Sequence, residues 1–156
     1  MKILRPLLSL GAFLLTSFFS GCATSEYTSS YYHPEFLASI PVSLSARVSE
    51  IEKLDFDNLH LETITQDVLS SHHLVVIRKA EPLHQHVEHD VWALVVKGEA
   101  DFILGEKKMR LRPGSSVFVP RLTPHKATRR GKEVLAAFAI FTPPFDGKDT
   151  VRLEEK

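Results

Sequence analysis

The chain has few of the residues that mark several large protein classes. It contains one cysteine among 156 residues, so no disulfide can form within it. Seven glycines and nine prolines are too few for a fibrous or low-complexity chain. The 19 basic side chains are balanced by 19 acidic ones and form no long basic block, which argues against a nucleic-acid partner. At this length we expect one domain with a terminal extension, too short for a two-domain dinucleotide enzyme.

The N-terminus carries the pattern of an export signal. Lys2 and Arg5 provide a positive start, an apolar run extends from Leu7 to Phe19, and small residues follow. A helix of about thirteen residues spans about 20 Å, short of the roughly 30 Å hydrocarbon core of a bilayer, so a permanent membrane span is disfavoured. Residues 1–21 are therefore predicted to be a signal peptide that is removed from the mature protein.

The end of this segment resembles the lipobox of bacterial lipoproteins. Residues 19–22 read Phe-Ser-Gly-Cys, with Phe where the lipobox prefers Leu. The resemblance implies that Cys22 becomes the acylated N-terminus, and the open alternative is an ordinary signal peptide with a chance cysteine. Ala23 resembles an outer-membrane address, which implies a lipid-anchored protein at the periplasmic face of the outer membrane of the bacterial cell envelope. Residues 22–45, rich in Ser, Thr and Tyr, are expected to be the tether.

From residue 46 onward the sequence consists of short β-type runs between turn residues. Apolar runs recur at intervals of about ten residues, with Gly or Pro between them. Residues 47–54 fit either a short helix or an edge strand, and 59–64 alternate roughly between apolar and polar. No long stretch has a helical stripe, so we predict one all-β sandwich or barrel. The runs predicted as strands are 74–77, 91–96, 100–104, 109–111, 117–119 and 134–141.

Three histidines fall where a small barrel could bring them together. His84 and His86 are two residues apart, so on a strand both rings point to the same face, about 7 Å apart. His125 lies further along the chain, where a fold-back could place it opposite the pair. Three inward imidazoles would hold a metal ion and leave positions open for ligands. A His-x-His pair alone is equally well explained by two surface histidines, so the prediction depends on the surrounding pattern.

That surrounding pattern resembles the cupin family. Residues 143–149 resemble the tail of many small single-domain cupins, and the resemblance covers roughly residues 60–150. It implies a cupin domain over residues 46–156, folded as a double-stranded β-helix, which is a jelly-roll barrel. The residues similar to the first cupin motif, His-x-His with a later acidic residue and glycine, are His84, His86, Asp90 and Gly98. The residues similar to the second motif are Gly114, Pro120 and His125.

Four positions depart from the family pattern. Arg78 stands where a glycine often precedes the first motif. Leu122 and Arg129 replace a glycine and an asparagine in the second motif. Val91 stands where the family's Glu falls by the commonest spacing. The glycine losses concern turns, whereas the Glu loss concerns the metal site.

Several residues are candidates for the missing metal-binding carboxylate. Asp90 is the first, since a small bulge would turn its side chain inward. The alternates are His89, which keeps the strand parity of Val91, and Glu88. A three-histidine site is also sound, because neutral imidazoles alone hold a divalent ion, and such a site would stay more positive and favour anionic ligands. The expected cofactor is a divalent Fe, Mn, Zn or Ni ion.

Other candidates have weaker support in the sequence. Trp92 and Phe102 either fill the core or line the mouth of a ligand pocket. Arg121 could face the same mouth, where its guanidinium would suit a carboxylate. His72 and His73 are expected to lie solvated in a turn before a strand.

The sequence thus favours an exported, lipid-anchored, metal-binding protein whose activity stays open. One hypothesis is a metal-dependent enzyme of the dioxygenase or isomerase type acting on a small molecule. The alternative is a non-catalytic envelope lipoprotein that binds or senses a metal or small ligand, and a structural lipoprotein with a vestigial metal site is the third hypothesis. The expected partners are a small molecule and, through the lipid anchor, the membrane. A homodimer is implied by the family resemblance alone.

Overall fold

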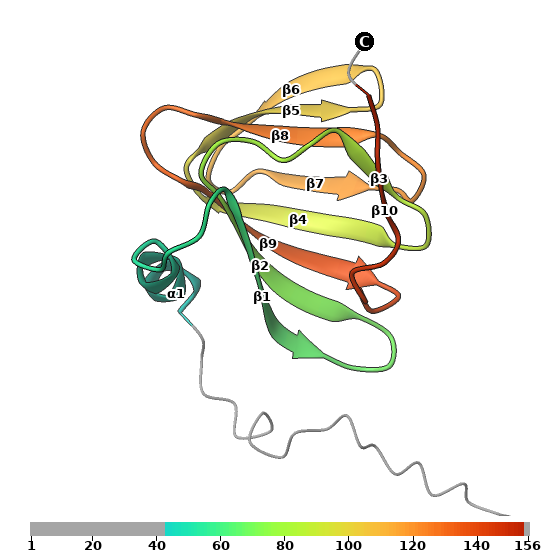
Figure 1. Ribbon diagram of the computed structural model, residues 1–156, viewed down its shortest axis with the longest axis horizontal. Coiled ribbons are helices and arrows are strands. Elements are labelled where there is room, and N and C mark those ends of the chain that lie inside the picture. Colours follow the sequence, from blue (N-terminus) through green and yellow to red (C-terminus); the bar gives the residue numbers. More distant parts are fainter. Residues whose placement is uncertain (1–42, 155–156) are drawn as a thin grey trace, which may run out of the picture.

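Two facing β-sheets and one short helix make up the part of the chain that the computed structural model describes, residues 43–154. The predicted leader, Cys22 and the tether up to residue 42 lie outside the described residues. Figure 1 shows the two sheets curving around a common interior, with the helix beside one of them. This is the jelly-roll architecture that the sequence predicts. Within the described range, no helix has the length and apolar character needed to span a membrane.

The first sheet joins segments that are far apart in the sequence. Its strand order is β1-β2-β9-β4-β7, and all pairs are antiparallel. The late strand β9 lies at its centre, between β2 and β4. The sheet is therefore complete only when β9, from the C-terminal part of the chain, pairs with the earlier strands β2 and β4. The strands are β1 (Leu59–Gln66), β2 (Ser71–Ile77), β9 (Leu135–Thr142), β4 (Asp90–Lys97) and β7 (Ser116–Val119).

The second sheet places two of the candidate ligands side by side. Its strand order is β10-β3-β8-β5-β6. Strands β3 and β8 meet at one residue pair, His84 opposite His125. The short strand β10 then runs antiparallel along the other side of β3 (Figure 1). The strands are β10 (Thr150–Arg152), β3 (His84–His86), β8 (His125–Arg130), β5 (Glu99–Leu104) and β6 (Lys107–Leu111).

The main hydrophobic core lies between the sheets and follows strand alternation. In β7, for example, Val117 and Val119 are buried while Ser116 and Phe118 are exposed. Val91 belongs to this core, so the position at which the family's Glu falls is apolar and packed. The buried members are Ile77, Val91, Val95, Ala100, Phe102, Leu111, Val117, Val119, Ala127, Leu135, Ala139 and Phe141.

A second core lies on the outer face of the first sheet, under helix α1 (Leu44–Ile51). Residues 47–54, which fit a helix or an edge strand, thus begin as a helix. The Oγ of Ser43 caps it by accepting the amide of Ala46 at 3.3 Å. Val48 and Ile51 are fully buried against Leu74 and neighbouring side chains of the sheet. Burial of this apolar stripe is what holds a helix of only two turns.

Arg78 holds the loop that follows the helix. Its guanidinium lies 3.8 Å above the ring centroid of Phe56 and donates hydrogen bonds to the carbonyls of Glu52, Leu54 and Phe56. The arginine that replaces a family glycine therefore has a structural role here, because it ties the N-terminal segment to the end of β2.

Leu122 adopts a left-handed backbone conformation at the position where the second cupin motif has a glycine. Its φ is 60°, in the left-handed region, which costs a non-glycine residue about 1 kcal/mol. Its amide donates to the carbonyl of His86 at 2.6 Å. The turn after β7 is thus retained and bonded to the strand that carries two of the candidate ligands.

The expectation that His72 and His73 lie in a solvated turn is wrong. Both residues are in β2, which begins at Ser71. His73 is only 1% exposed, and its ring nitrogens hydrogen-bond Thr63 Oγ1 at 3.2 Å and Ser71 Oγ at 2.7 Å. Pairing of β2 with β1 and β9 extends the strand past the apolar run, and alternation turns His73 inward against Phe141.

Candidate metal centre and its cavity

The rings of His84, His86 and His125 converge inside the barrel. One ligand atom from each lies within 4.8 Å of the other two. The ring centroids are 4.1 Å apart for His84 and His125, 5.1 Å for His84 and His86, and 5.4 Å for His86 and His125. All three side chains are buried. The separations are short enough for the three rings to share one ion.

Backbone carbonyls fix the orientation of two of these rings. The Nδ1 of His84 faces the carbonyl oxygen of Pro82 at 2.9 Å, and the Nδ1 of His125 faces that of Thr123 at 3.0 Å. A carbonyl can only accept, so Nδ1 of each ring carries the proton. The lone pair of each Nε2 is then free for a metal, which is the arrangement of metal-binding histidines generally.

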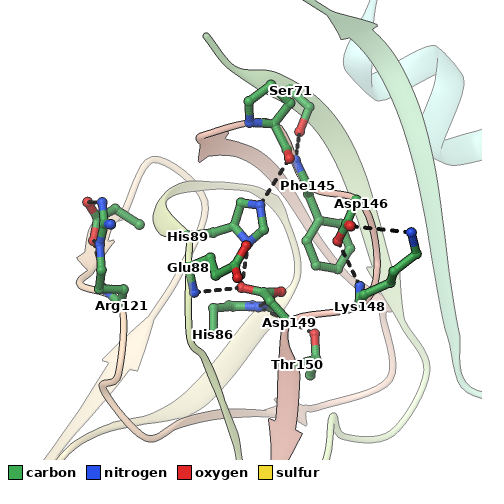
Figure 2. A network of polar contacts seen from close by, with 12 residues as sticks. Ser71, His86, Glu88, His89, Arg121, Phe145, Asp146, Lys148, Asp149 and Thr150 are labelled. Atoms are coloured by element: carbon green, nitrogen blue, oxygen red, sulfur yellow. Dashed lines mark hydrogen bonds and ion pairs between the residues drawn. The ribbon is translucent and has the colours of Figure 1, made fainter. Parts of the chain in front are cut away.

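The carboxylate of Asp149 orients the third ring, that of His86 (Figure 2). Its Oδ1 accepts the Nδ1 proton of His86 at 3.2 Å. Its Oδ2 accepts the amide of Glu88 at 3.1 Å and the Nδ1 proton of His89. The Nε2 of His89 faces the carbonyl of Pro144 at 3.0 Å, so both nitrogens of that ring face acceptors. The ring of His89 is thus held between Asp149 and Pro144.

Burial keeps the three converging histidines neutral. Removal from water is the largest influence on each, and it lowers the pKa of His84 and His86 below the ordinary value and that of His125 to about 4. For Asp149, burial alone would raise the pKa, but the hydrogen bonds from His89, the Glu88 amide and His86 together hold it below its ordinary value. At neutral pH the site thus offers neutral imidazoles, the form that binds a metal.

The structure does not bring Asp90 to these histidines. Its Oδ2 lies 2.8 Å from Nη2 of Arg121 at the surface, and its Oδ1 accepts the Arg121 amide at 2.8 Å. The hydrogen bonds from Arg121 hold the pKa of Asp90 below its ordinary value. Asp90 pairs with Thr142 in the β4–β9 ladder, without the bulge that would turn its side chain inward.

The two alternates are also outside the converging set. Glu88 is exposed, and its amide binds Asp149. His89 is buried, but Asp149 and Pro144 occupy its two nitrogens. The candidate centre is therefore the three-histidine site, which the sequence left open as the alternative without a carboxylate.

A cavity of about 600 Å³ opens beside the three histidines, between the sheets. Phe102 lines it, whereas Trp92 and Arg121 do not. Alternation in β4 turns Val91 inward, so Trp92 lies on the outer face, 54% exposed and packed against Phe118. Arg121 is held at the surface by its ion pair, away from the Asp149 network in Figure 2. Of the three pocket candidates, only Phe102 lies where the sequence analysis expects it.

Two charged residues of the cavity wall, Glu81 and Arg152, are not among the site residues predicted from the sequence. Glu81 donates its amide to the carbonyl of Ala127 at 3.0 Å, and its Oε1 accepts the Ala127 amide at 2.7 Å. Burial raises the pKa of Glu81 to about 7. Arg152 lies on β10 opposite His84 and also lines the cavity. In sequence, Glu81 reads only as the end of a strand and Arg152 as part of a charged tail, so neither gives a signal.

Replacing Glu81 with glutamine should remove the loss of folding stability that deprotonation of the Glu81 carboxyl causes at high pH. The folded pKa of about 7 lies above the ordinary 4.5, so the stability that Glu81 contributes is full below 4.5 and is lost as pH rises through 7. Glutamine keeps an acceptor for Ala127 and has no proton to lose. The free energy of unfolding of the metal-free Glu81→Gln variant, relative to wild type, should be about 3 kcal/mol higher at pH 8.5 than at pH 4. Urea unfolding at both values measures this.

Glu106, exposed in the turn between β5 and β6, provides the matched control. Glu106→Gln should change stability equally at the two pH values. The same result for Glu81→Gln would show that the Glu81 carboxyl is solvated in the folded protein.

The fold and site together define a class: a single-domain jelly-roll protein with a candidate three-histidine metal centre inside the barrel. The family described as "Cupin domain" (Cupin_2) matches residues 73–141. An uncharacterized protein of Aquifex aeolicus (strain VF5) is 32% identical over 123 residues, which cover 79% of this chain and 97% of that relative. The chain belongs to the cupin family.

Solved structures agree with this fold. One is an uncharacterized conserved protein with a double-stranded β-helix domain from Klebsiella pneumoniae subsp. pneumoniae MGH 78578. It superposes with a TM-score of 0.61 at 16% identity, over 75% of this chain and 99% of that one. Another is the protein TT1209 from Thermus thermophilus, with a TM-score of 0.56 at 18% identity, over 63% of this chain and 95% of that one. At these identities the likeness concerns the fold alone.

Proposed function

We propose that this protein is a metal-binding cupin of the bacterial cell envelope, in which His84, His86 and His125 hold one divalent ion. The observation that carries the proposal is the common state of the three rings. Each is buried, each commits Nδ1 to an oxygen acceptor, and the three converge within 4.8 Å. Three protein ligands leave coordination positions open for a small molecule, and Fe, Mn, Zn and Ni all suit imidazole ligands.

The open positions and the cavity support a metal-dependent enzyme of the dioxygenase or isomerase type acting on a small molecule. When bound, the ion supplies polarisation of a ligand oxygen. The protein supplies a largely apolar cavity and, on its wall, the carboxyl group of Glu81, whose pKa of about 7 suits proton exchange near neutral pH. A stoichiometric ion without any turnover would instead support the non-catalytic binding module.

Elemental analysis of the purified full-length chain tests the metal site. We expect about one divalent ion per wild-type chain, because three neutral ligands in fixed orientation bind with high affinity. His84→Ala and His125→Ala should each retain less than about a tenth of that content. His72→Ala is the control, since His72 lies on β2 outside the converging set and should leave the content unchanged. Wild type without an ion, or His125→Ala with a full one, would contradict the proposal.

The envelope location rests on the sequence pattern of residues 1–22 and is part of the same proposal. Cys22 is expected to carry the lipid that anchors the protein to the periplasmic face of the outer membrane. Metabolic labelling with a fatty-acid probe should mark the wild-type chain in the outer-membrane fraction and leave Cys22→Ser unlabelled. Equal labelling of the two chains, or none, would exclude anchoring through this residue.

A further inference from the structure

The cavity wall is apolar away from the histidines. Its aliphatic members come from both sheets and include Val75, Ile77, Val95, Leu111, Val117 and Leu135. Asn58 also lines it, but its amide is used on the chain itself, donating to the carbonyl of Ala80 and accepting the amides of Lys79 and Ala80. A sugar or other polyol would leave most of its hydroxyl groups without partners here, which is costly in a desolvated site. The wall therefore suits a ligand with a hydrocarbon body.

One cation stands beside the candidate centre without a counter-charge. Arg152 lines the cavity and is paired with His84 in the β10–β3 ladder. Its side chain is exposed at the edge of the cavity, and among residues 43–154 it makes no ion pair or hydrogen bond. A guanidinium presents a planar fork that matches a carboxylate. Its position at the edge of an apolar space marks where the charged end of an amphipathic ligand would lie.

The charge balance of the site also favours a ligand with a negatively charged end. Each converging imidazole has its proton on Nδ1 and leaves Nε2 unprotonated for the ion, so the three rings are neutral ligands, and the carboxylate beside them is that of Asp149. The charge of a divalent ion at the centre would exceed that of Asp149, and Arg152 would add a further positive charge. The acidic groups on the wall are Glu81, bonded to the Ala127 amide, and Asp57, which is exposed near Lys79. The site that forms is net positive and calls for an anion.

We propose that the cavity binds an aliphatic monocarboxylic acid, with its carboxylate between the metal ion and Arg152 and its hydrocarbon chain between the two sheets. This deepens the proposed function and rests on it for the ion. The observations that carry it are the unpartnered guanidinium beside His84 and the aliphatic wall around one cavity of about 600 Å³ in the described part of the chain.

Calorimetric titration of the zinc-loaded full-length protein with acetate, butanoate, hexanoate and octanoate tests the proposal. Affinity should rise about two- to fourfold with each added CH₂, because each one leaves water for the apolar wall. Octan-1-ol should bind at least about tenfold more weakly than octanoate, since it lacks the charge. Arg152→Gln should weaken octanoate about tenfold or more without changing the zinc content.

Two further variants serve as controls. Arg110→Gln removes an exposed arginine on β6 that does not line the cavity, and Trp92→Ser removes an exposed apolar ring from the outer face of β4. Both should bind octanoate as wild type does. Equal affinity for all four acids, or wild-type affinity in Arg152→Gln, would overturn the proposal.

These measurements distinguish a failure of the proposed metal site from a failure of the proposed ligand class. A chain that takes up zinc but shows no dependence on acid length keeps the metal site and loses the ligand class. A chain that takes up no zinc, yet binds octanoate through Arg152, loses the metal site and keeps the aliphatic acid as ligand. His84→Ala, titrated beside wild type, separates the contribution of the ion from that of the guanidinium.

Discussion

Replacing Gly98 with alanine is expected to lower the free energy of unfolding by about 3 kcal/mol or more. Gly98 links β4 to β5 with φ of +72°, in the left-handed region. A Cβ built on it would lie 2.2 Å from the carbonyl oxygen of Val134 and 3.2 Å from Cα of Leu135. Both atoms belong to backbone at the start of the central strand β9, so they cannot move aside as a flexible side chain could.

Urea unfolding of Gly98→Ala beside Gly105→Ala separates the cost of the steric clash with β9 from the cost of the left-handed backbone conformation. Gly105 has a similar φ of +57°, but a Cβ there would meet no atom within 4 Å. Gly105→Ala should therefore cost only the conformational strain, about 1 kcal/mol. Equal losses in the two variants would show that the backbone of β9 yields at no cost and that the close approach is unimportant.

Gly98 illustrates why the fold could be predicted from the sequence. The glycine and the two histidine motifs are local patterns with fixed spacing, and each marks a place where the backbone geometry permits few residues. The apolar runs between them reappear as β2, β4, β5, β6, β7 and β9. Strand alternation and turn residues are short-range properties, so a single sequence carries them.

The site could be predicted only in part, because half of it depends on long-range docking. His84, His86 and His125 could be identified from spacing and from their place in the motifs. Asp149 and Arg152 reach the centre only because the C-terminal segment docks against β3. No periodicity links a residue of the tail to one near position 86, although residues 143–149 resemble a family tail without any sign of a role.

Asp90 shows how a one-residue uncertainty in strand register changes a prediction. Side chains alternate between the two faces of a strand, so an acid one position early points outward unless a bulge intervenes. Here β4 pairs regularly from Asp90 to Val95, and the irregularity comes only between Val95 and Lys97. Asp90 consequently meets Arg121 at the surface, and the same parity places Trp92 outside the barrel.

Replacing Asp149 with asparagine is expected to damage both the fold and the centre. The carboxylate accepts three hydrogens, from the ring of His86, the ring of His89 and the amide of Glu88. An amide of the same shape can accept with one end only, so at least one buried donor loses its partner and the remaining hydrogen bonds lose the charge that strengthens them. We expect the free energy of unfolding to fall by about 3 kcal/mol, which urea unfolding of the metal-free protein measures.

The same substitution should weaken zinc binding about 10- to 100-fold, because the His86 ring loses the group that fixes its tautomer and orientation. Competition with a chelator measures this, and Asp146→Asn is the matched control. Asp146 lies three residues away but is bonded only to Lys148 at the surface, so its substitution should leave both quantities unchanged. If Asp149→Asn bound zinc as tightly as wild type, the hydroxyl of Thr150, 3.4 Å from Nδ1 of His86, would be sufficient to orient the ring. Asp149 would then serve the fold through His89 alone.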